Sequence, residues 1–318
     1  MPNIYIYSPS GATRDKAAFK RGVQRLKKAG YGVTLDDAAL LSEQRFAGDD
    51  AVRLAAIGRA SAAQVDMTLI ARGGYGLSRI LPQIDYEAIS ASIARGTQWM
   101  GFSDFTALQL ALLAKQGVGP GSITWAGLSV GDDIACIPRD GAEPDDITMA
   151  CFDDVLQGIG EGAGWRMSAA QAERCGEVAI ENAPLWGGNL SMVCSLLGTP
   201  YFPNYQALKG VKNGVLFLED VGETPYKIER MLTQLLHAGV LQSQSAIVLG
   251  AFNNYKLTPH DKGFNFKTVV AWLRQHVNIP IVEGLPFGHV ETKVCLPVGA
   301  RVSLQVQGRD AFILWQHL

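Results

Sequence analysis

The sequence lacks several features that mark well-known functional classes. It has only five cysteines in 318 residues and no Cys-x-x-Cys pair, so neither a disulfide framework nor a cysteine-rich zinc site is expected. No apolar run approaches the length of a membrane span. The N-terminus has neither the basic segment nor the long apolar segment of a secretion signal. These absences predict a cytoplasmic protein with reduced thiols.

The chain also lacks a strong excess of charge, because its formal net charge is only -2. A near-neutral chain gives no electrostatic reason to expect nucleic acid or an anionic membrane as a partner. The sequence has no His-Glu-x-x-His, Walker lysine or Gly-x-Gly-x-x-Gly motif. We therefore expect no metal and no cofactor. A pair of carboxylates suited to glycoside hydrolysis stays open, since 30 acidic residues always allow some pair.

The first half of the chain alternates apolar strand patterns with helical patterns. Such alternation predicts an α/β fold with a doubly wound parallel sheet. Glycine residues dominate the stretch 158–164, which we interpret as part of a flexible linker. The predicted organisation is an N-terminal domain over 1–157, a linker over 158–170 and a C-terminal domain over 171–318.

The second half has a different pattern, with short strands and few helices. One helix is expected to begin near Pro225, with proline in its first turn, and another over 266–276. This pattern predicts a smaller, strand-rich mixed α/β domain. The expected strands span 177–180, 215–219, 246–251, 279–282, 302–306 and 311–315.

Ser103 lies where an apolar strand ends at Gly101 and a helical pattern begins. A sharp turn at the carboxyl edge of an α/β sheet exposes such a side chain beside the first N–H groups of the helix. Ser103 is therefore a candidate nucleophile, and the backbone N–H of Asp104 would lie beside an oxyanion. Serine also favours helix N-caps for its own hydrogen bonds, so a capping role stays open.

Gly73 and Gly74 follow the predicted strand 65–71 and fall at the same sheet edge as Ser103. Glycine there permits positive φ and a close approach of a ligand to the backbone. The pair could supply a second oxyanion N–H, from Gly74, or could simply form a tight turn.

A serine nucleophile needs a base and an acid that orients the base. Among the histidines, His289 lies in a loop after a strand, where functional groups are often carried. Glu219 ends an apolar strand, and a carboxylate there is costly unless it is paired. A solvated loop histidine, and a turn-capping role for Glu219 or Asp220, stay open as alternatives.

Six segments, in order along the chain, resemble the LD-carboxypeptidases (muramoyltetrapeptide carboxypeptidases). This family of serine peptidases includes the microcin C immunity hydrolases. Each motif is weak alone, whereas six in order are specific. The segments are Phe46-Ala47-Gly48-Asp49-Asp50, Ala71-Arg72-Gly73-Gly74-Tyr75-Gly76, Gly101-Phe102-Ser103-Asp104-Phe105-Thr106, Leu185-Trp186-Gly187-Gly188-Asn189-Leu190, Leu218-Glu219-Asp220 and Phe287-Gly288-His289.

The resemblance implies a flavodoxin-like N-terminal domain, a distinct C-terminal domain and a Ser-His-Glu triad between them. Ser103 would be the nucleophile, His289 the base and Glu219 its partner, with the N–H groups of Gly74 and Asp104 as the oxyanion hole. Many relatives carry a Gly-Pro pair where this chain has the segment 125–129, so the local pocket shape is expected to differ. The resemblance further implies a homodimer without metal or cofactor.

The implied reaction is removal of the terminal D-alanine from murein tetrapeptides in peptidoglycan recycling. The third substrate residue, meso-diaminopimelate or lysine, is left open. Gly73 is a further candidate for substrate contact. A carboxypeptidase must also hold a free carboxylate, and a bidentate arginine is suited to this. Arg72, Arg79 and Arg230 are candidates by their proximity to the motifs.

Two other functions stay open. A microcin immunity-type amidase would cleave a peptidyl or aminoacyl nucleotide and would need a platform for the base, which Trp186 could provide. Trp186 could equally pack in a core. A non-catalytic protein that binds an anion at the Gly73-Gly74 loop is the third possibility.

Overall fold

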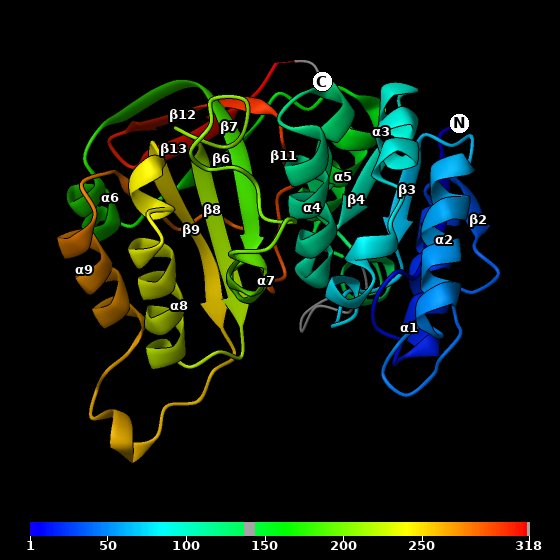
Figure 1. Cartoon of the computed structure of the whole chain (residues 1–318), viewed down its shortest axis with the longest axis horizontal. Helices are drawn as coiled ribbons and strands as arrows, with labels where there is room; N and C mark the ends of the chain where they lie inside the picture. Colours follow the sequence, from blue (N-terminus) through cyan, green and yellow to red (C-terminus); the bar gives the residue numbers. More distant parts are fainter. Residues whose placement is uncertain (137–143, 317–318) are drawn as a thin grey trace.

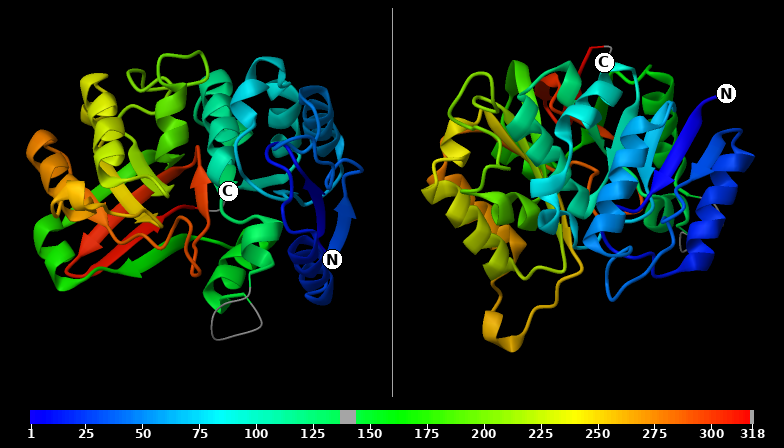
Figure 2. Two further views of the ribbon diagram at one scale, coloured as in Figure 1. Left: turned by 90° about the horizontal axis from the view of Figure 1, so that it is seen from below. Right: turned by 45° about the vertical axis from the view of Figure 1, so that its right-hand side comes forward.

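The computed structural model describes residues 1–136 and 144–316. Figure 1 shows two domains side by side, each built on one β-sheet, with the first half of the chain on the right. Helices α4 (Thr106–Gln116) and α7 (Leu190–Leu196) pack against each other where the domains meet. Figure 2 shows the same neighbours from a second direction. Within the described ranges, no helix is both long and apolar enough to cross a bilayer.

The N-terminal domain is a doubly wound sheet, as predicted. Its strand order is β11-β5-β4-β3-β1-β2, and strands β1 to β5 are parallel. The order 2-1-3-4-5 is that of flavodoxin-like folds, which confirms the fold that the resemblance implied. These strands are β1 (Asn3–Tyr7), β2 (Gly32–Leu35), β3 (Met67–Ile70), β4 (Gln98–Gly101) and β5 (Thr124–Ala126).

Helices pack around this sheet, and its central strands are largely buried. Ile4 and Ile6 of β1 are fully buried, as expected for a parallel strand covered on both faces. The first helix begins where the Asp15 side chain accepts from two backbone N–H groups, and Phe19 and Leu26 lie on its buried face. The helices are α1 (Lys16–Lys28), α2 (Asp50–Ala62), α3 (Tyr86–Ala94), α4 and α5 (Asp146–Gln157).

The C-terminal domain is a mixed sheet with the strand order β10-β9-β8-β7-β12-β13-β6. Strands β7 to β10 are parallel, and the remaining neighbours are antiparallel. The strands are β6 (Gly162–Arg166), β7 (Val178–Asn189), β8 (Val215–Val221), β9 (Ala246–Asn253), β10 (Ile281–Glu283), β12 (Arg301–Gln307) and β13 (Asp310–Leu314). The helices are α6 (Ala169–Cys175), α7, α8 (Pro225–His237) and α9 (Phe266–His276).

Two segments differ from the sequence-based expectation. The stretch interpreted as a linker, 158–170, contains β6, the edge strand beside β13. Its glycines serve packing, since a Cβ on Gly164 would lie 3.0 Å from the Phe312 ring. In addition, β11 (Leu296–Val298) comes from the C-terminal half but pairs antiparallel with β5 of the first sheet. The chain therefore crosses between the two sheets three times, before β6, before β11 and after β11.

Candidate active site

Ser103 lies on the turn between β4 and α4, as the sequence predicts. Its φ is 62°, a left-handed conformation that costs a non-glycine residue about 1 to 3 kcal/mol and is common at functional sites. Ser103 does not occupy a helix N-cap position. The N-cap of the 3₁₀ turn is Phe102, and the N-cap of α4 is Phe105. The capping alternative is therefore excluded, and the strained turn presents the hydroxyl to a cleft.

Glu219 and His289 form a hydrogen-bonded pair in the same region. Glu219 ends the apolar part of β8 beside a register irregularity and is fully buried. Its Oε2 lies 3.0 Å from His289 Nδ1, and its Oε1 accepts a 3.0 Å hydrogen bond from Asn189 Nδ2. A carboxylate acceptor places the proton on Nδ1, which leaves Nε2 free to accept another.

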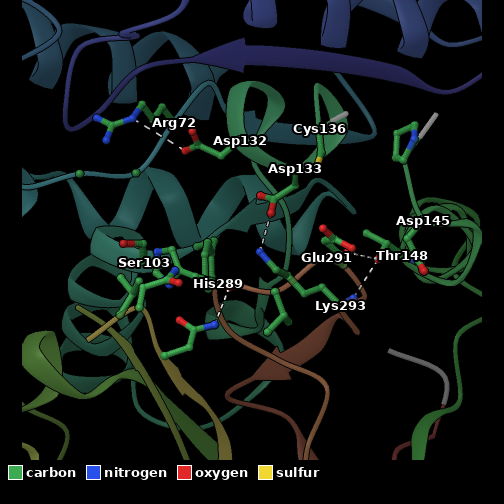
Figure 3. Close-up of a pocket in the computed structure, with 18 residues that line it drawn as sticks. Arg72, Ser103, Asp132, Asp133, Cys136, Asp145, Thr148, His289, Glu291 and Lys293 are labelled. Atoms are coloured by element: carbon green, nitrogen blue, oxygen red, sulfur yellow. Dashed lines mark hydrogen bonds and ion pairs between the residues drawn. The ribbon is translucent and has the colours of Figure 1, made fainter. Parts of the chain in front are cut away.

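Ser103 and His289 line one cleft of about 740 Å³ (Figure 3). The rings of Phe102, which precedes Ser103, and His289 lie 4.5 Å apart between centroids. Among the described residues no hydrogen bond joins Ser103 to His289. Catalytic hydrogen bonds are often long without substrate, so this geometry is compatible with proton transfer between the two side chains.

The loop that follows β3 lies directly against Ser103. A Cβ built on Gly73 would lie 3.0 Å from Ser103 Cβ, and Gly74 has a φ of 83°. The side chain of Asp104 connects this loop to the Ser103 turn, because its Oδ2 accepts a 2.9 Å hydrogen bond from the Leu77 N–H. Gly74 and Asp104 are thus on neighbouring backbone segments beside Ser103, where an oxyanion hole was predicted.

Asp104 is almost fully buried, and burial raises the pKa of its carboxyl group to about 6. The Leu77 N–H, the Ser10 hydroxyl and the Arg53 guanidinium lower this pKa, but burial outweighs them. Asp104 therefore changes charge within the pH range of ordinary assays.

The remaining candidates for substrate contact have different positions. Gly73 and Arg72 line the cleft, and Arg72 Nε lies 3.8 Å from Asp132 Oδ2. Burial lowers the pKa of the Arg72 guanidinium. Arg79 instead pairs with Asp50 at 3.1 Å, outside the cleft lining. Arg230 is exposed on α8, also away from the lining.

Trp186 does not contact the cleft, which corrects the expected substrate contact. Its side chain is fully buried, and its indole Nε1 donates a 2.7 Å hydrogen bond to Gln244 Oε1. It also packs edge-to-face on Phe202. Trp186 lies on β7, a strand covered by helices, so its side chain belongs to the core.

Several polar residues of the site were not predicted. Asn189 is brought beside Glu219 by the parallel register of β7 and β8; a polar residue that ends an apolar strand was the available signal. Asp133, Thr148 and Lys293 line the cleft through contacts between the two domains, and no local sequence pattern indicates them. Over 1–136 and 144–316, no group of three His, Cys, Asp or Glu side chains is arranged to hold a metal ion.

Models of known families match both halves of the chain. The LD-carboxypeptidase N-terminal domain matches residues 4–121, and the LD-carboxypeptidase C-terminal domain matches residues 182–304. The crystal structure of a muramoyltetrapeptide carboxypeptidase from Oxalobacter formigenes is 32% identical, with a TM-score of 0.83 over 99% of each chain.

Two of the sequence relatives have names that state a function. A murein tetrapeptide carboxypeptidase of Pseudomonas aeruginosa is 29% identical over 74% of this chain and 70% of its own length. The microcin C7 self-immunity protein of Escherichia coli is 27% identical over 77% of this chain and 73% of its own length. With both domain models matched and the fold shared over its full length, the chain belongs to the LD-carboxypeptidase family of peptidases.

Proposed function

We propose that this chain is a serine LD-carboxypeptidase that releases the terminal D-alanine of murein tetrapeptides. The observation that carries the proposal is the Asn189–Glu219–His289 hydrogen-bonded chain, which lies beside Ser103 on its strained turn. The muramoyltetrapeptide carboxypeptidase of 32% identity supports the choice of substrate.

In the proposed reaction, His289 Nε2 takes the hydroxyl proton of Ser103 as Oγ attacks the carbonyl carbon of the terminal amide. The N–H groups of Gly74 and Asp104 stabilise the oxyanion. His289 then gives the proton to the leaving amine as the C–N bond breaks and D-alanine departs. A water molecule attacks the acyl group, loses its proton to His289, and the proton returns to Ser103 Oγ.

Arg72 is the proposed binding group for the free carboxylate of D-alanine. It lies beside the Gly73-Gly74 loop, and its contact to Asp132 is long, at 3.8 Å. A guanidinium that is partly buried and weakly paired gains two charge-assisted hydrogen bonds when a carboxylate binds.

A second candidate is amide cleavage of an aminoacyl nucleotide, favoured by the similarity to the microcin C7 self-immunity protein. The buried position of Trp186 removes the base platform that the sequence suggested for this substrate.

A direct comparison tests the two substrates. The enzyme is incubated with tetrapeptide and, separately, with an aminoacyl sulfamoyl adenosine, and the free amino acid is quantified. Release of alanine from tetrapeptide alone supports the carboxypeptidase. Release only from the nucleoside analogue contradicts it and favours the second candidate.

A further inference from the structure

The nucleophile and the base belong to different domains, so their separation depends on contacts across the cleft. Ser103 follows β4 of the N-terminal domain, whereas His289 lies on the loop between β10 and β11 of the C-terminal half. The next residues of that loop, up to Lys293, contact the N-terminal domain and continue into β11 (Figure 3).

Lys293 is the most buried ionisable residue of this loop, with a side chain only 1% exposed. Its Nζ lies 2.5 Å from Asp133 Oδ1 and 3.6 Å from the centroid of the Phe102 ring. The same Phe102 ring contacts the imidazole of His289, 4.5 Å away between centroids. One ammonium group therefore contacts the N-terminal domain directly beside the catalytic pair.

Both ends of this contact are fixed. Asp133 lies in a single π-helical turn, Val130–Ile134, and its Oδ2 accepts hydrogen bonds from the Ser129 N–H at 2.7 Å and hydroxyl at 3.0 Å. The Lys293 N–H donates to Thr148 Oγ1 at 2.8 Å, and that hydroxyl donates to the Glu291 carbonyl at 3.2 Å. The loop is thus held through both its backbone and the Lys293 side chain.

Stability alone does not explain a buried ammonium at this place. Removing two charges from water costs several kcal/mol for each ion, and well-packed apolar residues often stabilise a fold as much as a buried ion pair. The ion pair does fix the position of the Lys293 side chain, because an ammonium group held by a carboxylate and a ring face has one favourable position.

We propose that Lys293 is a positioning residue: paired with Asp133 and in contact with Phe102, it holds the His289 loop at the separation from Ser103 that proton transfer requires. This inference rests on the proposed role of Ser103 as nucleophile. A displacement of about 1 Å at a catalytic centre can cost about 100-fold in rate, so loss of the pair should slow the chemistry and leave substrate affinity nearly unchanged.

The test measures the rate at which a fluorophosphonate labels Ser103, together with kcat and KM for tetrapeptide and the denaturation midpoint. Labelling forms an Oγ–P bond, expels fluoride and passes the Ser103 proton to His289. Its rate therefore depends on the Ser103–His289 pair and does not require the natural substrate. Lys293→Met should label at least about 30-fold more slowly, with kcat reduced and KM little changed. Lys293→Arg, which keeps the charge, should recover most of the rate.

Two further variants separate positioning from general destabilisation. Arg59→Met removes another ion pair with a buried aspartate, Asp36, away from the cleft, and should label at the wild-type rate. The double variant Asp133→Asn with Lys293→Met should lose no more than Lys293→Met alone, since both changes break one contact.

Wild-type labelling in Lys293→Met, or additive losses in the double variant, would overturn the inference. So would equal losses in Lys293→Met and Lys293→Arg that follow their denaturation midpoints. If Lys293→Met does not fold, the labelling rates of Asp133→Asn and Lys293→Arg still test the inference, because the first variant breaks the ion pair and the second keeps it. A wild-type protein that is never labelled at Ser103 would instead contradict the proposed nucleophile, which keeps the two failures distinct.

Discussion

Replacement of Glu219 by glutamine should reverse the tautomer of the catalytic histidine. Asn189 Nδ2 donates to Glu219 Oε1, while Glu219 Oε2 accepts from His289 Nδ1. In Glu219→Gln the amide oxygen must face the Asn189 donor, so the amide NH₂ points at His289 Nδ1. Nδ1 then has to accept, the proton moves to Nε2, and the imidazole no longer takes a proton from Ser103.

The size of the effect follows from two losses. Turning the glutamine amide back would leave the Asn189 and glutamine NH₂ groups facing each other, at about 1 to 3 kcal/mol for a buried unsatisfied donor. Loss of the carboxylate also removes a charged hydrogen bond to the imidazolium, about 1.5 to 3 kcal/mol. Together these predict a fall in kcat of about 100-fold to 10⁴-fold, with KM nearly unchanged.

A compensating change tests the reason for the loss. In Glu219→Gln with Asn189→Asp, the new aspartate accepts from the glutamine NH₂, and the amide oxygen faces His289 Nδ1 again. The introduced carboxylate also keeps the acceptor that caps α7 at the Met192 N–H. We expect the double variant to recover at least about tenfold of the lost kcat. Full activity in Glu219→Gln, or no recovery in the double variant, would refute the tautomer argument.

Three further predictions concern the stability, the substrate contact and the oxyanion loop. The pKa of Asp104 rises from 3.8 to about 6 on folding, so the folded state binds this proton more tightly and stability falls as pH rises through this range. Asp104→Asn removes that dependence. Urea denaturation should show the variant gaining about 2 kcal/mol relative to wild type between about pH 4.5 and about pH 7.5, and an equal difference at both pH values would contradict this. Arg72→Met should raise KM for tetrapeptide at least about tenfold and spare an amidated analogue; equal effects on both would exclude a carboxylate contact. Gly74→Ala places a side chain at a φ of 83° and 2.6 Å from Arg72 Nη1, so kcat should fall about 100-fold, and steady-state kinetics at the wild-type level would argue against an oxyanion role for this loop.

Local patterns predicted the regular elements because each pattern is complete within its own segment. The helix α9, over 266–276, has the predicted bounds, since its apolar face repeats at helical spacing. The β11 strand was not predicted, because three residues carry too little pattern and its partner β5 is about 170 positions away along the chain.

The site was predictable where a residue ends a strand or lies in the loop that follows one. Ser103 was identified because it follows β4 at the carboxyl edge of the first sheet, and Glu219 because a carboxylate that ends the apolar part of β8 is costly unless it is paired. The position of Trp186 depends on which face of β7 is covered, and a segment with glycines on both faces does not indicate this. No sequence pattern indicated a role for Lys293, because its partner Asp133 belongs to the other domain.

In the proposed function, Ser103 cleaves the terminal amide of a murein tetrapeptide. Mass spectrometry of the tetrapeptide L-Ala-D-Glu-meso-diaminopimelate-D-Ala, incubated with wild type and with Ser103→Ala, tests it most directly. We predict loss of one alanine with wild type alone. Unchanged tetrapeptide with wild type would contradict the substrate, and loss of alanine with both proteins would contradict the nucleophile.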